Sequence, residues 1–291
     1  MTPSQLALLG LASAAAGAIN AVAGGGTLLT FPALLGVGIP SISANATNTA
    51  GLAPAAFVGA WSFRDRLDEN GRKLLLPLGL LGFAGALIGA GLLLITPVRL
   101  FDRLVPFLIL AATLLFAFPP KALTPRPPLP TSFVPQASMG KGETEGITTS
   151  SSPLPERRDE GETLGEGQGV RASGYILLFI VAIYGGYFGA GIGILTLAAL
   201  QILGFHDVGR ANAVKAVFTG GVNGVAAILF AIRGLVFWKE ALLVCACGMV
   251  GAWGGAGIAK KLGSQNVKKL VILIGVGLTL QTLWKFWIQP K

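Results

Sequence analysis

The segment INAVAGGGTLLTFPALL, residues 19–35, lies in the middle of an apolar run that covers residues 6–39. A straight helix that crosses a bilayer needs only ~20 residues, so a run of this length holds more than one helix. Gly24, Gly25 and Gly26 interrupt the run at its centre, and glycine both weakens a helix and permits left-handed backbone. The segment predicts two half-helices that meet at a bend. The pair either dips into the membrane and returns, or crosses twice as a thin hairpin.

The composition places the rest of the chain in a membrane as well. Hydrophobic residues make up 53% of the 291 residues and charged residues only 12%, whereas a soluble domain carries about 25% charged residues. A chain of this kind cannot cover its surface with charge, but a lipid bilayer accepts an apolar exterior. The net charge of +9 lies in short loops between apolar runs, which is typical of a membrane protein and not of a nucleic-acid-binding face.

Eight apolar runs fall into two series of four. They cover residues 6–39, 44–63, 74–95 and 104–118, and then residues 175–205, 211–232, 241–259 and 267–288. Residues 119–170 between the series are rich in Pro, Ser, Thr and charged residues, and cannot bury enough apolar surface to offset the entropy of ordering. We predict a first transmembrane repeat over 1–118, a disordered linker over 119–170 and a second transmembrane repeat over 171–291.

The two series repeat one another in sequence. The positions that match at one constant offset are Gly25 with Gly191, Thr30 with Thr196 and Gly38 with Gly204. After a one-residue insertion, the tripeptide at 44–46 matches the tripeptide at 211–213, which pairs Asn45 with Asn212 and Asn48 with Lys215. The second opening run is also interrupted by glycines, at residues 185–193. Each half therefore opens with a glycine-broken helix pair and continues with three ordinary spans.

This arrangement makes the two halves inverted relative to each other. If each opening run begins and ends on one side, three further spans carry the chain to the opposite side. One side of the membrane then holds the basic loops near residues 64–73 and 260–269, together with the linker and Arg210. We place that more basic side, and with it the linker, in the cytoplasm. Counting each opening run as one crossing would make the halves parallel and spread the basic loops nearly evenly, so the charge bias favours inversion.

Inverted repeats with broken helices are typical of transporters, whose substrate lies near the midplane where the half-helices meet. The N–H groups freed at half-helix N-termini carry partial positive charge and bind anions. We expect the substrate-binding residues among the glycines of the breaks and the polar side chains near them: Asn20, Gly24, Gly25, Gly26, Thr27, Asn45, Asn48, Gly189, Gly191, Asn212, Lys215 and Asn223. The alternatives are close helix packing for the glycines, as we expect of Gly85, Gly89, Gly251 and Gly255, and interhelical hydrogen bonding for the polar side chains.

Lys215 is the residue with the sharpest implication. It lies within an apolar run, about 10 Å from the expected helix start at ~1.5 Å per residue, where a cation costs roughly 3 kcal/mol unless it finds a partner. No acidic residue occurs in any of the eight runs, which also disfavours carriers of metal ions or organic cations. The missing partner is then an anionic substrate. The alternative is that the lysine extends to the membrane surface.

The sequence offers no constellation for catalysis. His206 is the single histidine of the chain and has no obvious serine partner, and there is no HExxH motif. Cys245 and Cys247 are two positions apart in an apolar run, so they form neither a CxxC redox pair nor a zinc site. We expect no enzyme activity and no cofactor.

The motifs resemble those of a known family. The stretch INAVAGGGTLLTFPALL followed by ANATNT at 44–49 is similar to the first signature of the TauE/SafE sulfite exporter family. The stretches GGYFGAGIGIL at 185–195, ANAVKAVFTGGVN at 211–223 and GLVFWKEAL at 234–242 resemble the second signature. The resemblance implies a multi-pass permease of the bacterial inner (plasma) membrane that moves sulfite or organosulfonates, often outward. The linker is longer than is usual for that family.

The sequence thus predicts an all-α, polytopic transmembrane helical bundle that moves a small sulfur-containing anion by alternating access around a midplane site. A permease for another small solute and a membrane scaffold without transport activity are the alternatives. The oligomeric state is not indicated by the sequence.

Overall fold

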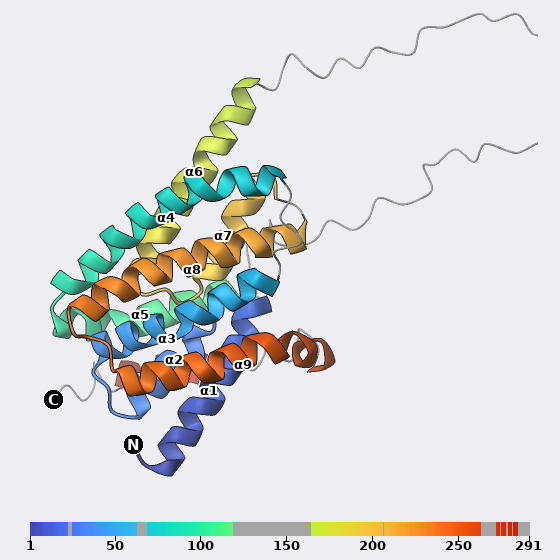
Figure 1. The fold of residues 1–291 in the computed structure, drawn as a ribbon. Helices are drawn as coiled ribbons and strands as arrows, with labels where there is room; N and C mark the ends of the chain where they lie inside the picture. Colours follow the sequence, from blue (N-terminus) through green and yellow to red (C-terminus); the bar gives the residue numbers. More distant parts are fainter. Residues whose placement is uncertain are drawn as a thin grey trace, which may run out of the picture.

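The computed structural model describes residues 1–22, 25–62, 69–118, 164–205 and 207–262, with short pieces of the last apolar run at 272–273, 275–277, 279–280 and 282–284. These residues form helices and no strand, which confirms the all-α prediction (Figure 1). Gly24, His206 and residues 119–163 of the predicted linker lie outside the described residues. The remaining linker residues, 164–170, form the first turns of a helix.

The helices follow the apolar runs in order. The first half contains α1 (Pro3–Val22), α2 (Thr27–Gly36), α3 (Ser41–Ser62), α4 (Glu69–Ile95) and α5 (Val98–Ala117). The second half contains α6 (Leu164–Tyr187), α7 (Ile192–Ile202), α8 (Val208–Ile232) and α9 (Trp238–Leu262). The helix α5 begins six residues before the apolar run that predicts it, so Arg99, Asp102 and Arg103 belong to its first turns.

The two opening runs are each broken once, but not into two half-helices as expected. The helices α1 and α6 have 20 and 24 residues, and only α2 and α7, with 10 and 11 residues, are short. At ~1.5 Å per residue the short helices are about 15 Å long, half the thickness of a bilayer. The glycines inside α1 pack rather than break it: a Cβ on Gly17 would overlap the carbonyl of Gly248 in α9.

Helix packing in the first half is reproduced in the second. The helix α1 packs on α9 as α6 packs on α4, and α3 packs on α9 as α8 packs on α4. The central pair, α3 and α8, is its own counterpart in this scheme. Among the pairs formed by α1–α4 and α6–α9, exchanging the two halves therefore leaves the set of packed helices unchanged.

Contacts along these pairs give their directions. Gly85 and Gly89 of α4 lie against Ala182 and Tyr187 of α6 in the same order, so these two helices run parallel. Along α3 and α8 the order reverses. The hydroxyl of Thr47, near the start of α3, accepts from the N–H of Phe237 just beyond α8, whereas Phe57 further along α3 lies against Gly220. The helices α3 and α8 consequently run antiparallel.

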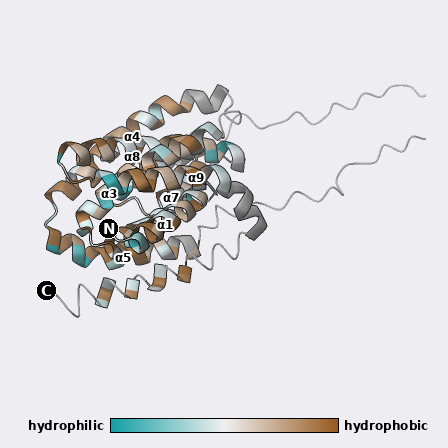
Figure 2. Ribbon diagram, turned by 60° about the horizontal axis from the view of Figure 1, so that its bottom comes forward, coloured by the Kyte–Doolittle hydropathy of each residue, from teal (hydrophilic) through white to brown (hydrophobic). Residues whose placement is uncertain are grey.

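The exterior of the bundle is apolar. Large hydrophobic side chains such as Leu76, Ile228 and Trp253 are mostly exposed, and hydrophobic residues predominate along the helices (Figure 2). Among the described helices, residues Leu74–Ile95 of α4 and Gly209–Ile232 of α8 are long and apolar enough to cross a membrane by themselves. The polar residues in the first turns of α3, such as Ser41 and Asn45, are buried by the rest of the bundle, whereas Arg99 and Arg103 in the first turns of α5 are exposed.

Substitutions at two glycines of α4 test how closely α4 packs against α6. A Cβ added at Gly89 would overlap the carbonyl of Ile183 in α6 and lie 2.8 Å from the N–H nitrogen of Tyr187, whereas a Cβ at Gly91 meets no atom within 4 Å. We expect Gly89→Ala to lower the free energy of unfolding by about 1–3 kcal/mol and Gly91→Ala to change it little. Thermal unfolding of the detergent-solubilised protein measures both. Equal melting temperatures for the two variants would contradict the parallel α4–α6 contact.

Candidate functional site

The break between α1 and α2 depends on glycine for two different reasons. Gly25 has φ 134°, a left-handed conformation that other residues avoid. Gly26 lies so close to α1 that a Cβ would stand 2.5 Å from the carbonyl oxygen of Ala16. The helix α2 begins immediately afterwards at Thr27, so its N-terminus is held inside the bundle against α1.

The break between α6 and α7 is built from the corresponding glycines. Gly189 and Gly191 have φ 74° and 76°, and Gly191 is the N-cap of α7. The hydroxyl of Tyr184 donates to the carbonyl of Ala190 at 2.7 Å and so ties the last turn of α6 to the break. The ring of Phe188 lies edge-on to Phe31 of α2, with centroids 5.3 Å apart. Gly185 and Gly186, which the sequence also suggested as breaks, lie within α6 and pack against Ile192 and Ala86.

A first polar cluster joins α2 to α3. The hydroxyl of Thr30 donates to the side-chain oxygen of Asn48, and the amide group of Asn48 donates to the hydroxyl of Thr27 at 3.2 Å. Asn45, one turn earlier on α3, donates from its amide nitrogen to the carbonyl of Tyr187 at 2.9 Å. The last bond crosses between the two halves of the chain. The structure thus brings three predicted site residues, Thr27, Asn45 and Asn48, to the start of α2 and the end of α6.

A second polar cluster lies on α8. The Lys215 ammonium donates to the side-chain oxygen of Asn212 at 2.8 Å, and the hydroxyl of Thr219 donates to the carbonyl of Lys215 at 2.8 Å. Lys215 is only 3% exposed, so it does not extend to the membrane surface. The stripe of polar residues predicted on this helix therefore faces the interior over Asn212, Lys215 and Thr219, while Asn223 further along is half-buried.

The two clusters lie on opposite sides of the bundle's centre. Asn48 and Lys215 are each seven residues after the first residue of their helices, α3 and α8, which is about 10 Å at ~1.5 Å per residue. Because these helices run antiparallel, the two side chains approach the centre from opposite ends. Asn20 of α1 is half-buried.

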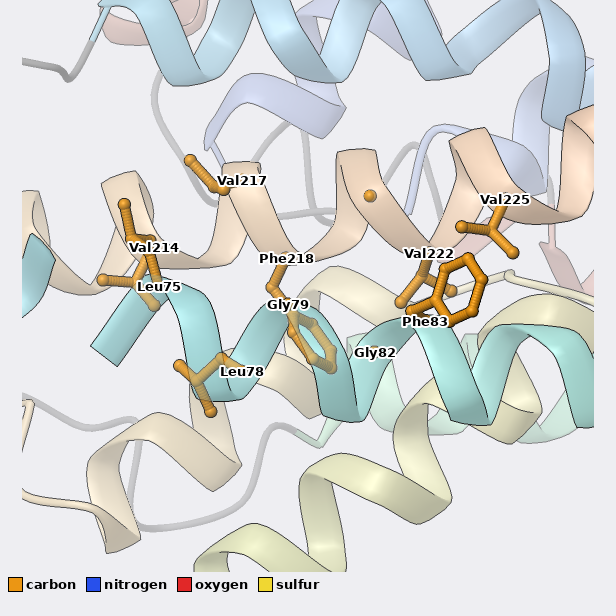
Figure 3. A pocket seen from close by; sticks show the side chains of 11 residues that line it. Leu75, Leu78, Gly79, Gly82, Phe83, Val214, Val217, Phe218, Val222 and Val225 are labelled. Carbon is orange, nitrogen blue, oxygen red and sulfur yellow. The ribbon is translucent and has the colours of Figure 1, made fainter. Parts of the chain in front are cut away.

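A cavity of about 230 Å³ lies elsewhere, between α4 and α8 (Figure 3). Its described lining is apolar and includes Leu78, Phe83, Phe218 and Val222. Phe83 is half exposed on the outer surface, so the cavity is a groove that faces lipid and not a chamber for a polar solute. The predicted site residues do not line it. Of their polar side chains, Asn45, Asn48, Asn212 and Lys215 are buried, and Asn20, Thr27 and Asn223 are half-buried.

Three residues near the second break had no place in the sequence-based site. They are Ser41, Asp102 and Tyr187. The hydroxyl of Ser41 donates to the carboxylate of Asp102, and the carbonyl of Tyr187 accepts from Asn45. The rings of Phe101 and Tyr187 lie 5.9 Å apart, which brings the first turns of α5 against the end of α6. No local signal identifies such residues, since their contacts link segments far apart in sequence. A charged residue next to a long apolar run was the one available indication for Asp102.

Comparison with known proteins finds a matching family model and several similar proteins. The family model described as sulfite exporter TauE/SafE matches residues 9–282. A probable membrane transporter protein of Sinorhizobium sp. is 27% identical over 96% of this chain and 92% of its own length, and one of Haemophilus influenzae is 27% identical over 96% and 94%. The probable membrane transporter protein YfcA of Escherichia coli K12 is 22% identical over 98% and 91%. No solved structure matches the chain.

The positive φ of Gly191 gives a test of the backbone geometry at the second break. Gly191 has φ 76°, and a Cβ there would stand 3.6 Å from Ala112, an ordinary contact. Gly191→Ala should therefore lower stability through the backbone alone, by about 1–2 kcal/mol. The matched change Gly221→Ala, in a regular turn of α8 with no atom within 4 Å, should be neutral. Thermal unfolding of both purified variants checks this, and an unchanged melting temperature for Gly191→Ala would rule out the left-handed turn.

Proposed function

The chain belongs to the sulfite exporter TauE/SafE family, and the relatives described above are named probable membrane transporter proteins. From this premise we propose that the chain moves small sulfur-containing anions such as sulfite or organosulfonates. The family makes it an integral membrane protein with a small-solute substrate. Export across a bacterial inner membrane is the direction and place that we propose for it.

The observation that carries the proposal is the burial of Lys215. A cation inside a membrane helix bundle needs a negative partner, because hydrocarbon does not solvate charge. The partner present is the neutral side chain of Asn212, whose amide oxygen supplies a dipole but no charge. The described acidic side chains with recorded partners lie elsewhere: Asp102 bonds Ser41, and Asp207 caps the start of α8. A bound oxyanion would complete the electrostatic pairing of Lys215.

The helix breaks supply the other groups that such an anion needs. The helices α2 and α7 begin inside the bundle, and their first N–H groups carry the positive end of each helix dipole. Glycines at both starts keep the backbone free of side chains there. Sulfite and sulfonates present three oxygens that accept hydrogen bonds from N–H groups and from an ammonium. We propose that Lys215 and these helix starts bind the substrate near the midplane.

The symmetry of the bundle supports alternating access. Equivalent helices α3 and α8 run antiparallel, as expected if the two halves are inverted repeats. The described polar residues at both clusters are nearly inaccessible, with Asn45, Asn48 and Lys215 at 0%, 2% and 3% exposure. This fits an occluded conformation. Rocking of one half against the other would then open the site first to one side of the membrane and next to the other.

Two other readings remain as alternatives. A permease for an uncharged solute would leave Lys215 without a charged partner during the whole cycle. A membrane scaffold would need no buried polar groups at helix breaks, and the relatives named as transporters argue against it.

Substitution of Lys215 tests the proposal directly. Lys215→Met keeps an unbranched side chain only one atom shorter and removes its charge, so the fold should persist. Sulfite flux into proteoliposomes should fall by at least about tenfold, the equivalent of 1.4 kcal/mol. The matched control is Lys239→Met, which alters an exposed lysine at the start of α9. Gel filtration and thermal unfolding verify folding of both variants. Full sulfite flux through Lys215→Met would remove this lysine from the site.

The charge of the substrate has its own signature. Uncompensated movement of an anion responds to the membrane potential by about 2.3 kcal/mol per elementary charge and 100 mV. With a potassium gradient and valinomycin to set the potential, sulfite uptake should rise when the vesicle interior is made positive. The fluxes of sulfite, a taurine-like sulfonate and a neutral solute, measured under the same conditions, then identify the class of substrate. Preferred transport of the neutral solute, without response to the potential, would favour the uncharged-solute reading.

A further inference from the structure

Asn45 presents a buried hydrogen-bond acceptor that has no partner. The side chain is 0% exposed, its amide nitrogen bonds the carbonyl of Tyr187, and its oxygen Oδ1 has no hydrogen-bond partner. The orientation of the amide is fixed by chemistry, because a backbone carbonyl can only accept and therefore faces the nitrogen. The oxygen must then point the other way. An unpaired buried carbonyl of this kind costs about 1–3 kcal/mol unless something positive meets it.

The second half of the chain shows what kind of group meets the equivalent oxygen. Asn212 matches Asn45 in the sequence repeat, and its oxygen accepts from the ammonium of Lys215 three residues later. The residue three positions after Asn45 is Asn48, whose side chain is engaged with Thr27 and Thr30. In the first half, the position of the ammonium is thus taken by a neutral side chain. The oxygen of Asn45 lacks the cation that its counterpart has.

The end of α6 and the carboxylate of Asp102 give one side of Asn45 a negative potential, opposite in sign to that of the α2 start. Tyr187 is the last residue of α6, and the carbonyls of a helix C-terminus carry partial negative charge. Ser41, one turn earlier on α3, bonds the carboxylate of Asp102, which adds a formal negative charge on that side of the bundle. Carbonyl, hydroxyl and carboxylate oxygens are the ligands preferred by hard metal cations. Unwound helix ends of this type also coordinate Na⁺ in other inverted-repeat transporters.

We infer that Asn45 Oδ1, which faces away from the Tyr187 carbonyl, binds a monovalent metal cation, with Na⁺ as its probe, that is transported with or exchanged for the anion. Asn45 donates across the two halves of the chain, so a cation at its oxygen favours the conformation in which α3 and the end of α6 are joined. The Lys215 ammonium is then the fixed counterpart of this mobile ion. The inference adds a coupling ion to the proposed function and does not depend on which anion is carried.

Na⁺-dependent stabilisation tests the site without any anion substrate. The purified full chain is unfolded thermally in equal concentrations of NaCl and of choline chloride, because a ligand that binds the folded state raises its stability by mass action. We expect a higher melting temperature in NaCl. Titration of Na⁺ at constant ionic strength, with choline as the replacement, gives the apparent affinity.

Substitutions at two positions of α3 separate ion binding from structural damage. Asn45→Ala and Asn45→Asp both lose the bond to Tyr187, but only the aspartate keeps an oxygen. The Na⁺ affinity should fall by at least about tenfold in Asn45→Ala and be retained or increased in Asn45→Asp. Asn48→Lys should place an ammonium against Asn45 as Lys215 does against Asn212, and should abolish the response to Na⁺. Ser13→Ala, which removes a buried hydroxyl bonded to Leu9 within α1, is the control and should keep the full response.

Two results would overturn the inference. Equal melting temperatures of the native chain in NaCl and choline chloride would show that no such cation binds. An unchanged Na⁺ affinity in Asn45→Ala would place the ion elsewhere. In either case, a sulfite flux that still depends on Lys215 would leave the proposed function intact, and a chain that binds Na⁺ but carries no sulfite would reject the anion proposal alone.

Discussion

The structure depends on the requirement that no backbone polar group may face hydrocarbon unsatisfied. Continuous helices meet this requirement by themselves, but the two breaks do not, and each has to be enclosed by protein. The first break is covered by α1, whose Ala16 carbonyl approaches Gly26. The second is covered by side chains, with Tyr184 bonding Ala190 and Phe188 packed between Phe31 and Phe101. The rest of the bundle can be understood as the enclosure of these two sites.

Enclosure also explains the chemical contrast between the clusters. Helix starts at the breaks provide positive potential and helix ends provide negative potential, so the proposed anion and cation would occupy different positions in the bundle. The proposed anion position lies in the second half at Lys215. The proposed cation position lies in the first half at Asn45, with Asp102 nearby. In the proposed mechanism, the sequence difference between the halves at Asn48 and Lys215 gives the repeated scaffold two unlike sites.

The helices and the positions of the breaks could largely be predicted from the sequence, because a membrane helix is recognised by the length and hydropathy of its apolar run. The apolar run at 74–95 coincides with the span found in α4, and the glycines at 25–26 and at 189 and 191 mark the breaks. Gly185 and Gly186 were misread, because a glycine that allows close packing looks the same in sequence as one that bends the chain. The length of α1 was misjudged for the same reason. The bond from Asn45 to Tyr187 was beyond the sequence, since it depends on how the halves dock.

The docking of the halves has a consequence for biosynthesis. The first half emerges from the ribosome before the second, yet its Asn45 and Phe31 find their partners, Tyr187 and Phe188, only in the later segment. Until that segment is inserted, a buried amide and an aromatic ring of the nascent chain stand without their contacts. The first half therefore reaches its final packing only when the second half has been inserted.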